Sequence, residues 1–170
     1  MKLPNWLFRR KNETKLSEAG KSVISIIEQL LTLQHILEYK KPSDALSVLR
    51  KNKLAAGYVF GFHDCCLRIF GLLDPDNPDD GLQLIAASYR YIFNDTSNAL
   101  FRMSIKLQDD RDFSVGQLSG GDDYAGFQHK KIPPLGLKRI LLGGFDTAAV
   151  LRGQPEFAAM LSVAKPRNNR

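Results

Sequence analysis

Residues 54–72 read LAAGYVFGFHDCCLRIFGL, and apolar side chains fall on nearly every side of the helix that this stretch predicts. A helix that is apolar all round is covered by neighbours on several sides, so we expect it inside the protein. Gly57 and Gly61 are four residues apart, and each costs a helix about 1 kcal/mol relative to alanine. Such a cost is usually offset when another helix approaches closely. The main local alternative is a strand through residues 58–60.

Two longer amphipathic helices are predicted on either side of this stretch. In residues 12–40, apolar side chains recur at steps of three and four, which is the period of one helix face, and Pro42 follows the end. A second stripe runs through residues 81–107, where five weak helix formers at 94–98 interrupt it. We therefore expect the second helix to bend or divide there.

Length and composition describe one soluble domain. The chain has 170 residues, of which 44% are hydrophobic and 25% charged. The central stretch carries three ionisable side chains that would be expensive inside a bilayer, so it is not predicted to span one. We predict an all-α fold, a single-domain irregular helical bundle of about five to seven helices, two of them long. The bundle covers residues 12–164, with short helices near 43–49, 135–142, 146–152 and 155–161.

The bundle is expected to be interrupted at residues 109–131, where the apolar period is lost. Glycines and aspartates alternate there, and a structureless stretch of this length is either a working loop or disordered. We therefore predict a long flexible loop. Its aspartates, with Tyr124 and His129, could line a cation or substrate site, and a flexible acidic linker explains them equally well. The aspartates are Asp109, Asp110, Asp112, Asp122 and Asp123.

The positive charge of the chain lies in its tails. The formal net charge is +6, to which residues 1–15 contribute +4 and the basic tail at residues 165–170 contributes +3. The body between them, residues 16–164, has a net charge of −1. A duplex-binding domain concentrates Lys and Arg on a folded face, so this distribution disfavours nucleic acid as the partner.

The N-terminal segment, residues 1–11, is both aromatic and basic. Three bulky apolar residues are followed directly by three basic ones, which is the chemistry of an anchor at an anionic membrane surface. The alternative, which free chain ends take more often, is that the aromatic residues fold back onto the bundle. The residues predicted to contact a membrane or a partner are Trp6, Leu7, Phe8, Arg9, Arg10 and Lys11.

Side chains with catalytic chemistry gather in the central stretch. His63 and Cys66 are three residues apart and share a helix side, so an imidazole could activate the thiol there. We prefer the interpretation that Cys65 and Cys66 are buried thiols and that Asp64 pairs with Arg68 four residues on. No metal site is predicted, because two thiols and one histidine lack the usual fourth ligand.

A polar stripe on the second long helix extends this group. Arg90 and Asn94 are four residues apart and face solvent unless the fold covers them. If it does, they form a polar network with the central helix. The possible polar pocket then consists of His63, Asp64, Arg68, Arg90 and Asn94.

These patterns favour a non-enzymatic helical adaptor or accessory protein that binds a protein partner and needs no cofactor. Its N-terminus could hold it peripherally at the inner face of a membrane. The first alternative is a small enzyme with a polar pocket under the 109–131 loop, and the second is nucleic-acid binding through the basic tails. Adjacent cysteines with no other thiol, and no apolar leader segment, lead us to expect a cytoplasmic protein.

Overall fold

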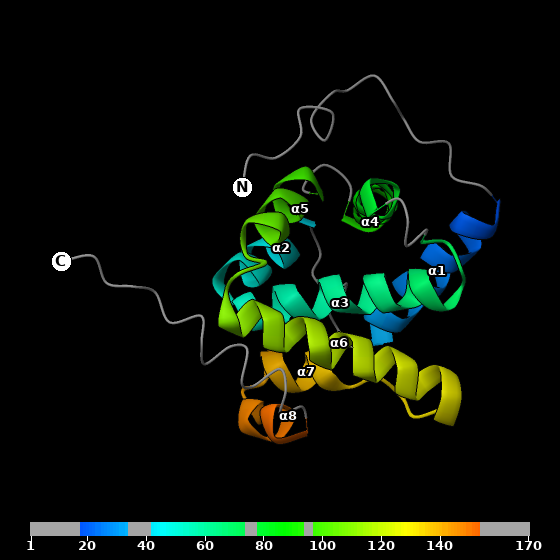
Figure 1. Cartoon of the computed structure of the whole chain (residues 1–170). Coiled ribbons are helices and arrows are strands. Elements are labelled where there is room, and N and C mark those ends of the chain that lie inside the picture. Colours follow the sequence, from blue (N-terminus) through cyan, green and yellow to red (C-terminus); the bar gives the residue numbers. More distant parts are fainter. Residues whose placement is uncertain (1–17, 34–41, 74–77, 94–96, 154–170) are drawn as a thin grey trace.

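The computed structural model describes residues 18–33, 42–73, 78–93 and 97–153. In these ranges the chain forms eight helices and no strand, which confirms the predicted all-α bundle (Figure 1). No helix of this described part is long and apolar enough to cross a bilayer. The helices are α1 (Glu18–Leu33), α2 (Pro42–Lys51), α3 (Lys53–Ile69), α4 (Pro78–Phe93), α5 (Ser97–Lys106), α6 (Arg111–Lys130), α7 (Gly136–Leu141) and α8 (Thr147–Gly153).

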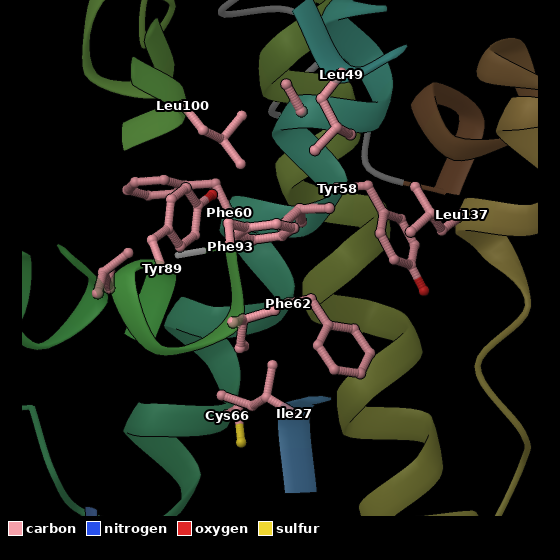
Figure 2. Close-up of a cluster of buried hydrophobic side chains, with 14 of the residues drawn as sticks. Ile27, Leu49, Tyr58, Phe60, Phe62, Cys66, Tyr89, Phe93, Leu100 and Leu137 are labelled. Carbon is pink, nitrogen blue, oxygen red and sulfur yellow. The ribbon is translucent and has the colours of Figure 1, made fainter. Parts of the chain in front are cut away.

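Helix α3 runs through the middle of the bundle, as its all-round apolar pattern predicts. The strand alternative for residues 58–60 is wrong, because these residues lie inside α3 and are buried. Figure 2 shows α3 side chains pointing toward different neighbours, with Tyr58 beside Leu137 of α7 and Cys66 beside Ile27 of α1. The core of the protein is therefore arranged around this one helix.

Residues 109–131 do not form the predicted flexible loop, because residues 111–130 form helix α6. Asp110 caps its first turn by accepting hydrogen bonds from the backbone N–H groups of Asp112 at 3.1 Å and Phe113 at 3.3 Å. Lys131, in the left-handed conformation at φ 56°, ends it. The buried face of α6 consists mostly of small residues. The sequence of this helix therefore shows little of the apolar periodicity that predicts an amphipathic helix. The residues of the buried face are Phe113, Ser114, Val115, Gly116, Ser119, Gly120 and Tyr124.

Helices α3 and α6 touch backbone to backbone at four glycines. A Cβ atom at any of the four positions would collide with backbone atoms of the opposite helix. Later residues of α3 meet later residues of α6, so the two helices run parallel, as Figure 1 shows. The expected close approach of another helix at Gly57 and Gly61 is thereby confirmed. The colliding pairs are Gly57 with Phe113, Gly61 with Gln117, Gly116 with Leu54 and Gly120 with Tyr58.

Polar contacts join the starts of these two helices. The Asn52 side chain caps α3 by accepting a hydrogen bond from the backbone N–H of Ala55 at 3.0 Å. One residue on, the ammonium group of Lys53 lies 2.6 Å from the Asp110 carboxylate that caps α6. Partial burial opposes the charge of Asp110, but the hydrogen bonds from Lys53 and the backbone lower its pKa below the usual value. The ion pair therefore connects the first turns of the two parallel helices.

The remaining described helices lie where the sequence predicts them, and one predicted helix is divided into two. The predicted helix over residues 81–107 is two helices, since α4 ends at Phe93 and α5 begins at Ser97. Helix α1 lies within the predicted range 12–40, whose two ends fall outside the described residues. Asp146 caps α8, accepting a hydrogen bond from the backbone N–H of Ala149 at 3.0 Å. The helix predicted over 155–161 also lies outside the described ranges.

Replacing Gly120 with alanine tests the backbone contact directly. The new methyl group must displace the backbone of Tyr58, and strain from overpacking outweighs the gain in helix propensity of about 1 kcal/mol. We expect G120A to lower the free energy of unfolding by about 2 kcal/mol, measured by urea denaturation.

Gly126 provides the matched control on the same helix. No other atom lies within 4 Å of the position that its Cβ would take, so G126A should raise the free energy of unfolding by up to about 1 kcal/mol. If both substitutions stabilise the protein equally, the two helices do not meet at Gly120.

Candidate functional site

His63 lies in the protein interior, packed against α4. Its side chain is 0% exposed, and its ring centroid is 4.9 Å from that of Tyr89 in an edge-to-face arrangement. Nδ1 donates a hydrogen bond to the backbone carbonyl of Val59 at 2.6 Å, which leaves Nε2 as an acceptor. Burial disfavours the charged ring strongly enough to lower the pKa of His63 to about 4. The imidazole is therefore neutral at physiological pH.

Two hydroxyl groups of α4 share this polar environment. Ser88 and Tyr89 are fully buried, and within the described ranges neither hydroxyl has a hydrogen-bond partner of ordinary geometry, nor does Nε2 of His63. The Tyr89 hydroxyl lies near Ser104, whose own hydroxyl donates to the carbonyl of Leu100 at 3.0 Å. Burial raises the pKa of Tyr89 above its usual value. The side chains of His63, Ser88 and Tyr89 are thus neutral polar groups in the core, as is that of Ser104.

The cysteines serve packing, in line with the preferred interpretation. Cys66 is fully buried, and burial raises the pKa of its thiol to about 12, while Cys65 is half-buried. An imidazole-activated thiol needs a proton to pass from sulfur to His63. Burial opposes the thiolate and the imidazolium alike, so the activated-thiol hypothesis for His63 and Cys66 is not supported.

Asp64 and Arg68 form the predicted ion pair. The guanidinium group of Arg68 donates two hydrogen bonds to the Asp64 carboxylate, at 2.8 Å and 3.1 Å. Both side chains are partly exposed, and Arg90 lies on the surface, whereas His63 is sealed in the core. Asn94 lies outside the described residues. The four described members of the predicted polar pocket therefore occupy different environments, and residues 111–130, expected to cover the pocket as a loop, are helical.

Asp123 is the acidic residue of α6 with a distinct structural role. Its Oδ2 atom accepts a hydrogen bond from the buried Tyr58 hydroxyl at 2.7 Å and another from the backbone N–H of Gly136, also at 2.7 Å. One carboxylate thus ties α6 to α3 and to the first residue of α7. Asp110 caps α6, and Asp109, Asp112 and Asp122 are not buried. The five aspartates therefore do not converge on one cation or substrate site.

A surface that the sequence pattern did not single out follows α6. We name residues 130–135 the basic-apolar turn. Lys130, Lys131, Ile132 and Leu135 are all exposed, with Ile132 at 55% and Leu135 at 40%. Pro134 is buried and anchors the turn to the body. In the sequence, the signal for this surface is the run KKIPPL at residues 130–135. The predicted contact residues 6–11 lie outside the described part of the chain.

Acidification tests the placement of His63. An unfolded histidine binds a proton near pH 6.5 and the buried one only near pH 4, so folding stability is complete above pH 6.5 and falls as the pH drops through this window. We expect the free energy of unfolding to be about 2 kcal/mol lower at pH 5 than at pH 7 through His63 alone. His63→Phe should remove this part of the pH dependence, and exposed His129→Gln should leave it unchanged. Equal pH dependence in wild type and H63F would contradict the sealed position.

Two substitutions at Asp123 separate its hydrogen bonds from its charge. Asp123→Ala leaves the buried Tyr58 hydroxyl and the Gly136 N–H without their acceptor, and should cost about 2 kcal/mol of unfolding free energy. Asp123→Asn keeps a carbonyl oxygen and should cost less than half as much. Hydrogen exchange of the Gly136 amide should accelerate in D123A only. Equal losses for both variants would mean that the charge carries the contact.

No family model, curated protein or solved structure matches this chain. Among the described residues, no three His, Cys, Asp or Glu side chains are grouped so that they could hold a metal ion. The function must therefore be inferred from the arrangement of this protein's own residues.

Proposed function

We propose that the protein is a non-enzymatic helical adaptor or accessory protein, which binds a protein partner and is held peripherally on an anionic membrane surface by residues 6–11. The observation that carries the proposal is that side chains of the types used in catalysis maintain the fold. His63 donates to its own helix inside the core, Asp64 pairs with Arg68, and Asp123 holds two helices together. The side chains left for recognition are those of the surface and the chain ends.

The chemistry of residues 6–11 supports the membrane part of the proposal. Trp and Phe side chains favour the boundary between headgroups and acyl chains, and each nearby Lys or Arg gains about 1 kcal/mol against anionic lipid. A segment with three apolar and three basic residues provides both contributions. One such segment gives reversible attachment, which suits a protein that must also reach a partner.

The enzyme alternative is less well supported than the adaptor. It relied on a mobile loop over residues 109–131 that covers a pocket, and residues 111–130 are instead a helix packed on α3 through its glycines. The nucleic-acid alternative relies on the basic tails, and it predicts binding to a duplex with a steep dependence on salt.

Vesicle binding of the full chain tests the membrane attachment. The full chain should co-sediment with vesicles of phosphatidylcholine and phosphatidylserine, and not with phosphatidylcholine alone. Deletion of residues 1–11 should weaken this binding by at least tenfold, because three basic and three apolar contacts are lost. The deletion should change the free energy of unfolding by less than about 0.5 kcal/mol.

The same deletion distinguishes the alternative in which the aromatic residues cap the bundle. In that case vesicle binding is unchanged and the free energy of unfolding drops by several times this amount, as expected for the loss of buried aromatic side chains. Such a result would remove the membrane attachment from the proposal.

A further inference from the structure

We infer that the basic-apolar turn, residues 130–135, is a second membrane contact, which docks on anionic lipid headgroups and sets the orientation of the helical body. The inference rests on the proposed peripheral attachment and adds a surface of the folded body to it. Its evidence is independent of residues 6–11, because it comes from exposure, charge and geometry in the described part of the chain.

The turn presents apolar and basic side chains together. Ile132 and Leu135 are two of the six large apolar side chains that are exposed in the described ranges, and Lys130 and Lys131 directly precede them. Lys131 ends α6 in the left-handed conformation, and its ammonium group lies 5.9 Å from the centroid of the Phe127 ring. The chain therefore turns sharply where these side chains project.

The backbone of the turn is already ordered. The N–H group of Lys131 donates to the carbonyl of Phe127 at 3.0 Å, and that of Ile132 donates to the carbonyl of Gly126 at 3.4 Å. The next two residues, Pro133 and Pro134, have restricted backbone conformations, and Pro134 is buried. Because the turn is already ordered, binding costs little conformational entropy. Most of the free energy of its few contacts therefore contributes to affinity.

The sequence segment that contains this turn is basic, although the Asp123 carboxylate reaches the N–H of Gly136 beside it at 2.7 Å. Residues 124–145 contain four basic residues and no acidic one, whereas the rest of residues 16–164 contains twelve basic and seventeen acidic residues. The nearly neutral body is thus positive in one segment and negative outside it. Against an anionic surface this distribution favours the orientation with the turn toward the lipid. The four basic residues are Lys130, Lys131, Lys138 and Arg139.

An anionic bilayer fits the turn better than an acidic protein does. A bilayer surface offers phosphates at the level of the ammonium groups and an apolar layer just below them, and lysine side chains extend to span the two. Ile132 and Leu135 are exposed just after the end of α6, so they can enter that layer. Two weak contacts in one chain, residues 6–11 and the turn, also strengthen each other by effective concentration.

Neutralising the two lysines tests the electrostatic half of the contact. The double variant Lys130→Gln with Lys131→Gln, in the full chain, should bind vesicles of phosphatidylcholine and phosphatidylserine about thirtyfold more weakly than wild type. The matched control is Arg50→Gln with Lys51→Gln. That pair is likewise exposed, adjacent and basic at a helix end, but Val48, Leu49 and Leu54 around it are buried or half-buried. The control should bind as wild type does.

Removing the apolar side chains tests insertion. Ile132→Ser with Leu135→Ser should weaken vesicle binding several-fold, because exposed apolar surface no longer enters the lipid. The control Tyr91→Ser removes an equally exposed side chain, at 52%, from α4. Circular dichroism and urea denaturation of every variant establish that the body remains folded.

The outcomes separate this inference from the proposed function. If the full chain binds no anionic vesicles, both fail. If deletion of residues 1–11 abolishes binding and the lysine variant binds as wild type does, the second contact fails and the proposed attachment stands. If the lysine variant loses binding to poly-glutamate and keeps its vesicle binding, the turn is a docking site for acidic protein and the lipid inference is overturned. Loss specific to the turn variants supports it.

Discussion

The contact on which the rest of the structure depends is the backbone-to-backbone meeting of α3 and α6 at four glycines. Because no side chain separates the two helices there, the large residues of α3 lie beside the glycines, where Phe60 meets Phe113 and Phe62 meets Tyr124 of α6, or face α1, α4, α5 and α7. Glycine inside a helix is unfavourable by itself, so this pair of helices forms only where the close approach offsets that cost. The contact at these four glycines therefore constrains the arrangement of the whole bundle.

The same arrangement determines how the ionisable side chains are used. The buried face of the central helix cannot keep a charged imidazole, and the His63 ring is neutral with a pKa of about 4. The Asp110 carboxylate caps α6, and the Asp123 carboxylate ties this helix to α3 and α7. Side chains that resembled a reactive centre in the sequence thus maintain the fold.

Charge is distributed unevenly over the body, although the net charge of the body is close to zero. Positive charge and exposed apolar side chains coincide where α6 ends, and acidic residues dominate the rest of the body. This asymmetry is the physical basis of the oriented attachment that we propose, in which a preordered turn adds to the aromatic and basic chain end. The two contacts have the same chemistry although they are far apart in the sequence.

Local spacing in the sequence was enough to predict the all-α class, the buried central helix, the approach of another helix at Gly57 and Gly61, and the ion pair of Asp64 with Arg68. These features depend on residues three or four positions apart, which the helical period places on one face. Helix α6 could not be predicted in this way, because its close contact with α3 is made at glycines, which give no apolar period. The exposure of Ile132 and the burial of His63 were decided by packing between segments distant in the chain, and only the tertiary structure contains that information.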